Sequence, residues 1–459
     1  MAGLKSTVTA RPVPALTVAQ GERRYLLLTA LRWLPVGITI PVTVLLALSR
    51  GLTLADVGLV FLAHSLLVAL LELPTGGLAD ALGRRPVLVA SGVLHLLSCL
   101  AYATAGSLAG FLLGAGLLAV GRALDSGPLE AWFVDAVRSA DPAADLAPGL
   151  ARAGVADCLA LAAGAVVGGL GPGLLGVALA LPYLAAVVLD LLSIGAVLLL
   201  VTPAAPAADG VLPAGVPPSA LTTVRDGVLA VPGTVRSAVA LAVGDSALRR
   251  VLVLSLVCGT SLGTLELLGP ALFAELSGSS SGGSGVFGVV MAASFLGGAT
   301  GYALARRSRR LARGSTRWAV AALTLGSGLA LLTVAAADTV LVAAAAYAGF
   351  YLLNAAGWPL LRALAHARVG AGQRATVVSA WSLALQAGGA LSNVVSPRLG
   401  GTGRAYAVAA GLAVVGAVVA AGLPRDAAPP DPVPLRGPGS PAAPTARRPA
   451  APARQRRPR

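Results

Sequence analysis

Charged residues are scarce in this chain: they make up 12% of its 459 residues, while hydrophobic residues make up 56%. Soluble domains carry about 25% charged residues. The composition therefore excludes a soluble globular protein and indicates one that crosses a membrane several times. Lysine is almost absent as well, since Lys5 is the single lysine among 34 basic residues. This bias is typical of a GC-rich bacterial genome.

Residue types that commonly carry chemistry are also few. The three cysteines fall in apolar runs and are interpreted as small buried hydrophobes, not as a disulfide framework; they are Cys99, Cys158 and Cys258. The three histidines are dispersed without metal-ligand spacing; they are His64, His95 and His366. The sequence contains no Gly-Lys-Ser/Thr loop for ATP phosphates and no nucleophile–base motif. We therefore expect no enzyme, no bound cofactor and no metal site.

The net charge of +15 could indicate nucleic-acid binding. The arginines, however, lie in short loops between apolar runs and in the C-terminal tail, and no nucleic-acid motif accompanies them. No nucleic-acid partner is expected. The first apolar run starts at Tyr25, contains Arg32 and Pro35 and lacks a cleavage site, so it is predicted to be a retained helix and not a signal peptide.

Twelve apolar runs are long enough to span a bilayer, which takes about 20 helical residues. They cover residues 25–49, 54–79, 87–106, 108–137, 154–173, 177–201, 250–273, 284–305, 318–337, 340–361, 374–396 and 404–423. The predicted fold is an all-α polytopic membrane protein with two six-helix bundles, embedded in lipid. The predicted parts are an N-terminal tail (1–24), a bundle (25–201), a linker (202–249), a second bundle (250–423) and a disordered tail (424–459).

Basic residues favour the cytoplasmic side of a membrane protein. If the N-terminus is cytoplasmic, every basic residue lies in a cytoplasmic segment with five exceptions: Arg32, Arg50, Arg122, Arg398 and Arg404. Both termini are therefore predicted to be cytoplasmic, and the linker and tail with them. The second part of the linker, near 221–248, has the spacing of an amphipathic surface helix.

A short polar turn, 76–88, separates the second and third apolar runs. Asp80 and the pair Arg84-Arg85 mark a membrane surface, because such residues are costly in hydrocarbon. Gly83 permits a tight turn, and Pro86 suits the first turn of a new helix. With Gly77, this turn resembles the loop between helices 2 and 3 of the major facilitator superfamily, whose basic residue after the Asp is here Ala81.

The resemblance implies secondary transport of a small molecule by alternating access, in a chain that acts as a monomer. It also implies a gate at the cytoplasmic face. Asp80 is expected to approach the start of helix 11, near residues 372–377, and Arg84 to contact Asp135 at the end of helix 4. Both contacts are expected to join the two bundles in the outward-open state only. The gate residues are Gly77, Asp80, Gly83, Arg84, Arg85 and Asp135.

Ionisable residues inside spans usually face a cavity or a partner. They are Arg32, Glu72, Arg122, Asp125, Glu130, Asp157, Asp190 and Glu266, and Glu266 alone lies in the C-terminal half. The N-terminal half is therefore predicted to hold most of a pathway for substrate and protons. Asp157 is interpreted as structural, and the other seven are pathway candidates.

Arg122 and Asp125 share a helix face. The run 121–127 resembles the helix 4 motif of proton-coupled exporters, although the glycine follows the arginine at five positions instead of four. The alternative is a structural pair in which Asp125 neutralises Arg122. We expect Glu72 to carry the proton, followed by Asp190 and Glu266, unless Glu72 instead pairs with Arg32 to hold helices together.

Two further patterns bear on the family resemblance. Glycines of the fifth run, between 164 and 176, resemble the Gly-Pro motif of exporters, and ordinary helix packing explains them equally well. The segment 301–310 can be aligned with 77–86 as a decayed copy of the same loop. The favoured function is proton-coupled efflux. The alternatives are an uptake permease or proton symporter, and a non-transporting membrane sensor or assembly factor.

Overall fold

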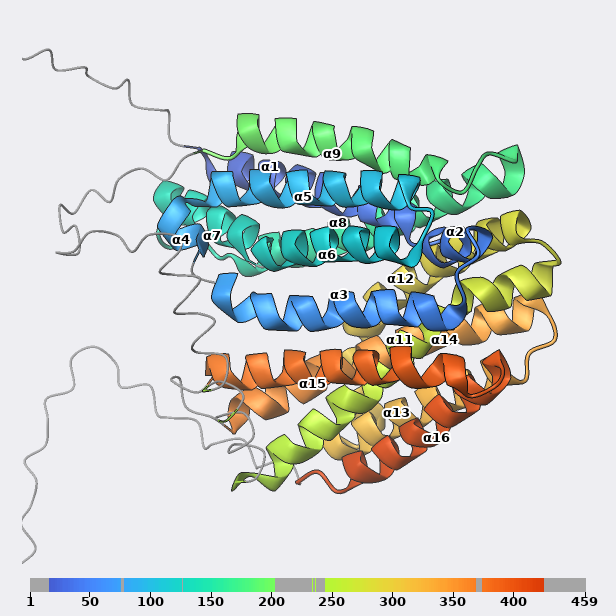
Figure 1. Ribbon diagram of the computed structural model, residues 1–459. Helices are drawn as coiled ribbons and strands as arrows, with labels where there is room; N and C mark the ends of the chain where they lie inside the picture. Colours follow the sequence, from blue (N-terminus) through green and yellow to red (C-terminus); the bar gives the residue numbers. More distant parts are fainter. Residues whose placement is uncertain are drawn as a thin grey trace, which may run out of the picture.

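The computed structural model describes residues 16–75, 78–125, 127–202, 233, 236, 244–368 and 374–424. Helices account for nearly all of these residues, and the described part contains no strand (Figure 1). Eleven helical spans in it are long and apolar enough to cross a membrane, and α15 completes a set of twelve. The predicted all-α fold of two six-helix bundles is confirmed.

The first bundle is built from residues before the linker. Its helices are α1 (Val18–Thr39), α2 (Thr43–Ser49), α3 (Leu54–Thr75), α4 (Leu78–Leu82), α5 (Arg84–Thr104), α6 (Leu108–Leu124), α7 (Pro128–Ala140), α8 (Ala147–Leu175) and α9 (Leu181–Leu200). The second contains α11 (Ser246–Ser277), α12 (Ser280–Leu311), α13 (Thr316–Ala335), α14 (Val340–Ala367), α15 (Arg374–Val395), the 3₁₀ turn η2 (Ser396–Arg398) and α16 (Thr402–Ala421).

The start of α1, the end of α9, the start of α11 and the end of α16 lie on one side of the molecule, together with α4 and α7 (Figure 1). We call this side the terminal face, and the side that carries α2 the opposite face. An even number of spans places both ends of the described chain on the same side of the membrane. The linker helix predicted near 221–248 falls almost entirely outside the described residues, as does the tail after residue 424.

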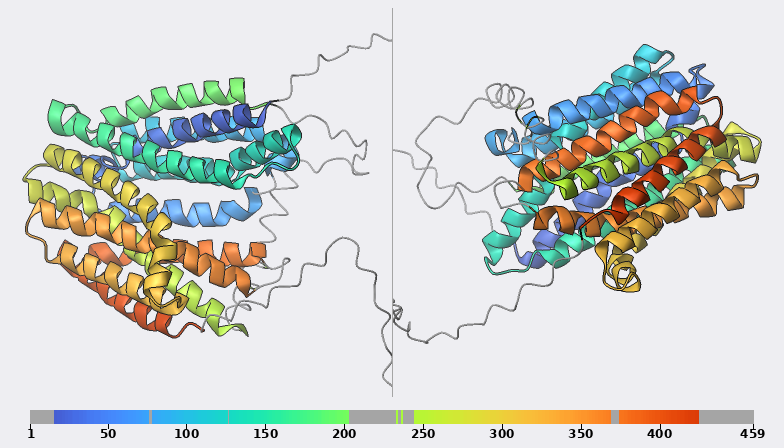
Figure 2. Two further views of the ribbon diagram at one scale, coloured as in Figure 1. Left: turned by 180° about the vertical axis from the view of Figure 1, so that it is seen from behind. Right: turned by 90° about the horizontal axis from the view of Figure 1, so that it is seen from below.

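The two bundles contact each other along two helix pairs, α8 with α12 and α3 with α15 (Figure 2). Glycines allow the backbones to approach closely there. A Cβ at Gly58 would lie 2.2 Å from the carbonyl oxygen of Asn393, and one at Gly288 would lie 2.3 Å from that of Ala165. Gly58 is four residues from the start of α3 and Gly288 eight from the start of α12. Both starts lie at the opposite face, so these close contacts between bundles gather there.

Two predicted spans are interrupted in the structure. Helix 1 begins at Val18 instead of residue 25, so part of the predicted N-terminal tail is helical, and a break at residues 40–42 separates α1 from α2. Helix 4 is not continuous over 108–137, because it breaks between α6 and α7. Gly127 there has a left-handed φ of 99°, and Pro128 follows as the first residue of α7. The Gly-Pro pair was the sequence signal for this break.

The segment 301–310 is not a copy of the loop between helices 2 and 3. It lies inside α12, which runs on to Leu311, and the chain turns only at 312–315. Arg313 and Gly314 take positive φ values of 54° and 80° in that turn. The first half of the chain instead ends a helix at Thr75 and starts α5 at Arg84, so the two loops differ in position and in shape.

Candidate functional site: a polar cavity between the bundles

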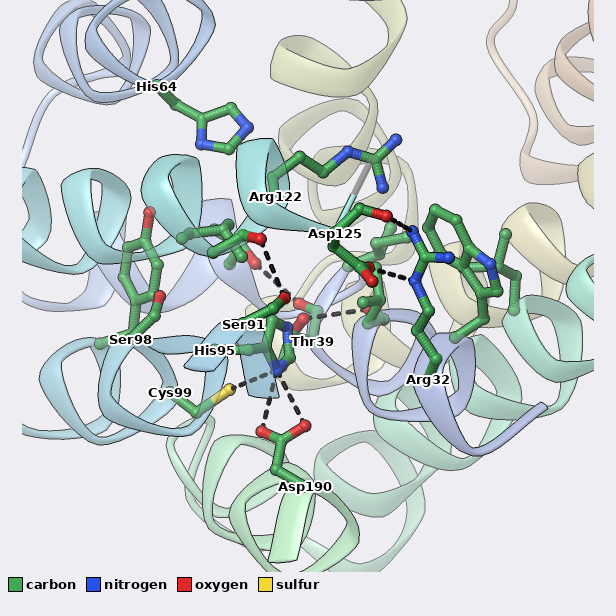
Figure 3. Close-up of a pocket in the computed structure, with 18 of the residues that line it drawn as sticks. Arg32, Thr39, His64, Ser91, His95, Ser98, Cys99, Arg122, Asp125 and Asp190 are labelled. Atoms are coloured by element: carbon green, nitrogen blue, oxygen red, sulfur yellow. Dashed lines mark hydrogen bonds and ion pairs between the residues drawn. The ribbon is translucent and has the colours of Figure 1, made fainter. Parts of the chain in front are cut away.

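A cavity of about 510 Å³ lies between the two bundles. The N-terminal bundle contributes most of the wall, including His95 and four of the predicted ionisable residues: Arg32, Arg122, Asp125 and Asp190. Glu266 comes from the other bundle. Figure 3 shows most of this group. The volume is that of a small-molecule site, which takes roughly 300–1,000 Å³.

Arg32 of α1 forms an ion pair with Asp125, at the end of α6. The same guanidinium donates a hydrogen bond of 3.4 Å to the backbone carbonyl of Asp125. That carbonyl belongs to the last turn of a broken helix, where carbonyl groups lack partners within the helix. Arg32 therefore compensates both the buried carboxylate and the exposed end of α6 (Figure 3).

The expected ion pair between Asp125 and Arg122 is not formed. Asp125 forms its ion pair with Arg32, from a helix far away in sequence. The guanidinium carbons of Arg122 and Arg32 both lie over the indole ring of Trp33, at 4.9 and 5.0 Å from its centre. An aromatic face attracts cations, so Trp33 lets two arginines lie close together at the cavity wall. Sequence reasoning missed Trp33.

A second polar cluster lies deeper in the N-terminal bundle. The Nδ1 atom of His95, on α5, lies 2.9 and 2.8 Å from the two carboxylate oxygens of Asp190, on α9. Cys99 lies one turn further along α5, with its Sγ 3.9 Å from the same nitrogen. No basic residue lies near Asp190 in the sequence; the fold supplies His95.

Two serines orient α5 so that His95 faces the cavity. Ser91 and Ser98 donate hydrogen bonds of 2.9 and 2.8 Å to the carbonyl oxygens of Gly121 and Gly114 on α6. His95 lies four residues after Ser91 and three before Ser98, so the three side chains share one broad face of α5. The serines contact α6, and His95 contacts Asp190 on α9.

The C-terminal bundle contributes one carboxylate and an aromatic wall. Glu266 of α11 opens into the cavity and lies within electrostatic reach of Arg122. Apolar side chains of α12 and α14 form the wall around it: Phe287, Met291, Phe295 and Tyr351. The cavity thus has opposite charges on its two walls, with the arginines on one bundle and Glu266 on the other.

The turn at the terminal face keeps part of its expected geometry. Gly83 takes a φ of 89° directly before α5, a conformation that residues with a Cβ rarely adopt. Arg84 forms an ion pair with Asp135, and Arg85 donates a hydrogen bond to the carbonyl oxygen of Leu198. All these residues belong to the N-terminal bundle. The Arg84–Asp135 contact therefore links α5 to α7. It does not form the expected contact between the two bundles.

Other predicted residues are placed as follows. Gly77 lies outside the described residues, as do the side chains of Glu72 and Asp80 and the segment 369–373 that Asp80 was expected to approach. Glu130 is exposed in the first turn of α7 and does not belong to the cavity wall given above. Asp157 of α8 lies within electrostatic reach of Arg32, Arg122 and Asp125.

The glycines of helix 5 pack against neighbouring backbones. A Cβ at Gly164 would lie 2.5 Å from the carbonyl oxygen of Leu34, and one at Gly168 would lie 1.9 Å from that of Ile38, both on α1. A Cβ at Gly169 would lie 2.4 Å from the carbonyl oxygen of Ser284, on α12. These contacts hold α1 against α8, and so they help to position Arg32 and Trp33.

The sequence pattern of the Major Facilitator Superfamily matches residues 25–393. The chain belongs to the major facilitator superfamily. The fold agrees with this assignment. The nucleoside transporter NupG is 13% identical, with a TM-score of 0.64 over 88% of this chain and 98% of NupG. The peptide transporter POT in complex with sulfate is 14% identical, with a TM-score of 0.65 over 88% of this chain and 94% of POT.

The human organic anion transporter MFSD10 (TETRAN) is 18% identical to this facilitator, with a TM-score of 0.59 over 90% of this chain and all (100%) of MFSD10. A search of curated proteins finds no match. Identities this low support a shared fold and nothing finer. The family and fold are those of transporters of small molecules and not of enzymes, and this facilitator is a multi-pass membrane protein.

Proposed function

We propose that this facilitator is a secondary active transporter that exports a small molecule in exchange for protons. The main support is the position of opposite charges at one cavity, with Arg122 on the N-terminal bundle and Glu266 on the C-terminal bundle. A site built from two bundles changes shape whenever they move relative to each other. Alternating access requires such a change.

Glu266 is the carboxylate that we assign to the coupling proton. Asp125 is held by Arg32, and Asp190 is bonded to His95, so both already have partners that favour one charge state. The Glu266 side chain lines the cavity and lies within electrostatic reach of Arg122. It belongs to neither of these two pairs. Glu72, the first choice from the sequence, remains the second candidate.

Three sequence features favour export: the end of helix 2 at 72–76, Arg122 in helix 4 and the glycines of helix 5. The second candidate function is uptake by the same fold, as a permease or proton symporter. The structural neighbours carry substrates as different as nucleosides, peptides and organic anions by their names, so they support transport without selecting a direction or a substrate. A non-transporting sensor is the third candidate.

We also propose a monomer in a bacterial inner membrane, with the terminal face in the cytoplasm. Arginines at this face support the orientation: Arg84 and Arg85 at the start of α5, and Arg309 and Arg310 at the end of α12. In a variant without native cysteines, a cysteine at Ser139 on the terminal face should be labelled only from the cytoplasm, and one at Ser107 only from outside. The reverse pattern would overturn the orientation.

Flux in proteoliposomes under an imposed pH gradient tests the function. A panel of dyes and nutrients is offered, and both driven accumulation and exchange without a gradient are measured. Glu266→Gln should abolish driven accumulation and retain exchange, because the amide keeps the shape of the side chain but carries no titrating proton. Glu275→Gln, on the same helix at its exposed end, is the matched control and should behave as the wild type.

The same assay separates the candidates. Export in exchange for protons predicts that the compound accumulates on the side that protons leave. Symport predicts that it accumulates on the side that protons enter, and no flux of any compound favours the sensor. If Glu266→Gln keeps full driven accumulation while Glu72→Gln loses it, the proton belongs to Glu72. If both variants keep it, neither carboxylate carries the proton.

A further inference from the structure

Three side chains beside the cavity bring together three donor types that bind metals. His95 Nδ1, Cys99 Sγ and a carboxylate oxygen of Asp190 all lie within 4.8 Å of one another. Figure 3 shows His95 between the other two, with contacts to both. All three residues line the cavity, and Cys99 and Asp190 are buried. Among the described residues, this is the one group of its kind.

The spacing of these donors matches that of a tetrahedral metal site. Bonds of about 2.3 Å to sulfur and about 2.0 Å to nitrogen place the two donors roughly 3.5 Å apart. The observed separation of Sγ and Nδ1 is 3.9 Å, and that of Nδ1 and the Asp190 oxygens is 2.8–2.9 Å. Both separations from Nδ1 are within about half an ångström of those around a bound ion, and Sγ lies within 4.8 Å of the Asp190 oxygen. A small movement of the Cys99 side chain would close the site around the ion.

The helices hold the donors in this arrangement. His95 and Cys99 are four residues apart on α5, so they lie on one face, one turn apart. Asp190 comes from α9, which packs against α5. Ser91 and Ser98 anchor α5 to α6 on either side of His95. The donors are thus fixed by helix packing and not by flexible loops.

We propose that His95, Cys99 and Asp190 bind a divalent transition-metal ion of the Zn²⁺ class, reached from the cavity. A thiolate and an imidazole select borderline-soft ions over Mg²⁺ or Ca²⁺. Three protein ligands leave one position open to water or to a small molecule in the cavity. The site lies apart from Glu266 and from the Arg32–Asp125 pair, so metal binding goes beyond the proposed proton coupling.

Binding balances charge within the site. The S–H bond of Cys99 breaks, an S–metal bond forms, and the thiol proton leaves through the cavity. His95 changes tautomer: its Nδ1 proton passes to water in the cavity, Nε2 takes up a proton, and the neutral imidazole donates the Nδ1 lone pair to the metal. No oxidant or reductant is involved. The thiolate and carboxylate together offset the two positive charges of the ion.

Cobalt binding to the purified, untagged protein in detergent tests the site. Co²⁺ should produce the thiolate-to-cobalt charge-transfer absorption in the near ultraviolet, at one ion per chain, and Zn²⁺ should remove it. Cys99→Ser should abolish this absorption, whereas Cys258→Ser should keep it. Cys258 is the matched control, because it lies in the C-terminal bundle, where its Sγ is 3.2 Å from the side-chain oxygen of Asn354. Asp190→Asn should weaken Zn²⁺ binding by at least about tenfold.

A second measurement avoids variants that fail to fold. In a protein whose Cys158 and Cys258 are replaced, Cys99 is the single thiol, and its alkylation by a small thiol reagent is followed. Zn²⁺ should slow the reaction and Mg²⁺ should not. The proposal is overturned if no cobalt–thiolate band appears, if Cys99→Ser keeps the band, or if Mg²⁺ protects as well as Zn²⁺. Neither measurement needs transport, so each can fail or succeed separately from the export assay.

Discussion

The two bundles share a helical plan but use the cavity differently. The N-terminal bundle places an ion pair, a cation–aromatic group and the His95 cluster at its wall. The C-terminal bundle places Glu266 and Asn393 there and otherwise offers aromatic and apolar side chains. Its own helices pack through glycine: a Cβ at Gly259 would lie 1.9 Å from the carbonyl oxygen of Leu385.

The comparison shows how charge is kept inside a membrane protein. In the N-terminal bundle, Arg32 pairs with Asp125 and His95 with Asp190, each from another helix, because an uncompensated charge in hydrocarbon is costly. Those pairs make this bundle a fixed scaffold. Glu266 faces its opposite charge across the cavity, between bundles, so its environment changes when the bundles move. In the proposed function, the N-terminal wall is therefore structural and Glu266 carries the coupling.

The largest expected effect breaks the scaffold of the N-terminal bundle. Arg32→Ala leaves the Asp125 carboxylate without its partner. The two side chains are 28% and 13% exposed, so the loss should stay below the roughly 3 kcal/mol of a fully buried pair. The midpoint of thermal unfolding in detergent should fall clearly, and the double variant Arg32→Ala/Asp125→Ala should recover much of the loss. Arg317→Ala in the other bundle is the matched control. The Arg317 guanidinium lies 5.1 Å from the centre of the Trp318 ring, and such a contact is worth about 0.5–1 kcal/mol.

If Arg32→Ala leaves the midpoint unchanged, the charge of Asp125 is compensated elsewhere and the scaffold interpretation is wrong. If the double variant is less stable than Arg32→Ala alone, Asp125 contributes through contacts other than this ion pair.

An intermediate effect sharpens the contrast between contacts within and between bundles. Gly288→Ala places a Cβ against the carbonyl oxygen of Ala165 in the other bundle, and overpacking of this kind costs about 1–3 kcal/mol. We expect the bundles to separate at the opposite face. A cysteine at Ser65, on the cavity wall, should then be labelled faster from that face, in a background without native cysteines.

Two glycines serve as controls for this experiment. Gly168→Ala crowds α1 within the N-terminal bundle, so it should lower the unfolding midpoint without changing which face labels Ser65→Cys. A Cβ at Gly411 would have nothing within 4 Å, and Gly411→Ala should be neutral in both assays. Equal labelling in the Gly288→Ala and Gly168→Ala variants would show that the bundles do not separate at this contact.

The smallest expected effect on stability concerns the turn at the terminal face. Arg84→Ala removes the pair with Asp135, whose side chain is 58% exposed, and exposed pairs contribute about 0–1 kcal/mol. The unfolding midpoint should therefore hardly change. We still expect slower flux, as for Asp80→Asn, because the family resemblance assigns this turn to the gate. Wild-type flux in both variants would remove the gating role.

Much of this architecture could be predicted from the amino-acid sequence. Apolar runs of about 20 residues have few alternatives to a spanning helix, so the twelve spans and their division around the linker follow from composition. The turn at 76–88 identified the family, which is confirmed over residues 25–393. The concentration of ionisable residues in the N-terminal half also follows from their positions in the sequence.

The partners of those residues depended on the tertiary structure. Arg32 lies 93 positions before Asp125, and His95 lies 95 before Asp190, and helical periodicity relates only residues a few positions apart. The nearest opposite charge in the sequence, Arg122 for Asp125, was therefore the wrong choice of ion-pair partner. Packing of α1 on α8 and of α5 on α9 decides which groups meet, because it sets the rotation of each helix about its own axis. The sequence determined which residues enter the membrane, and the contacts between helices decided what each of them does there.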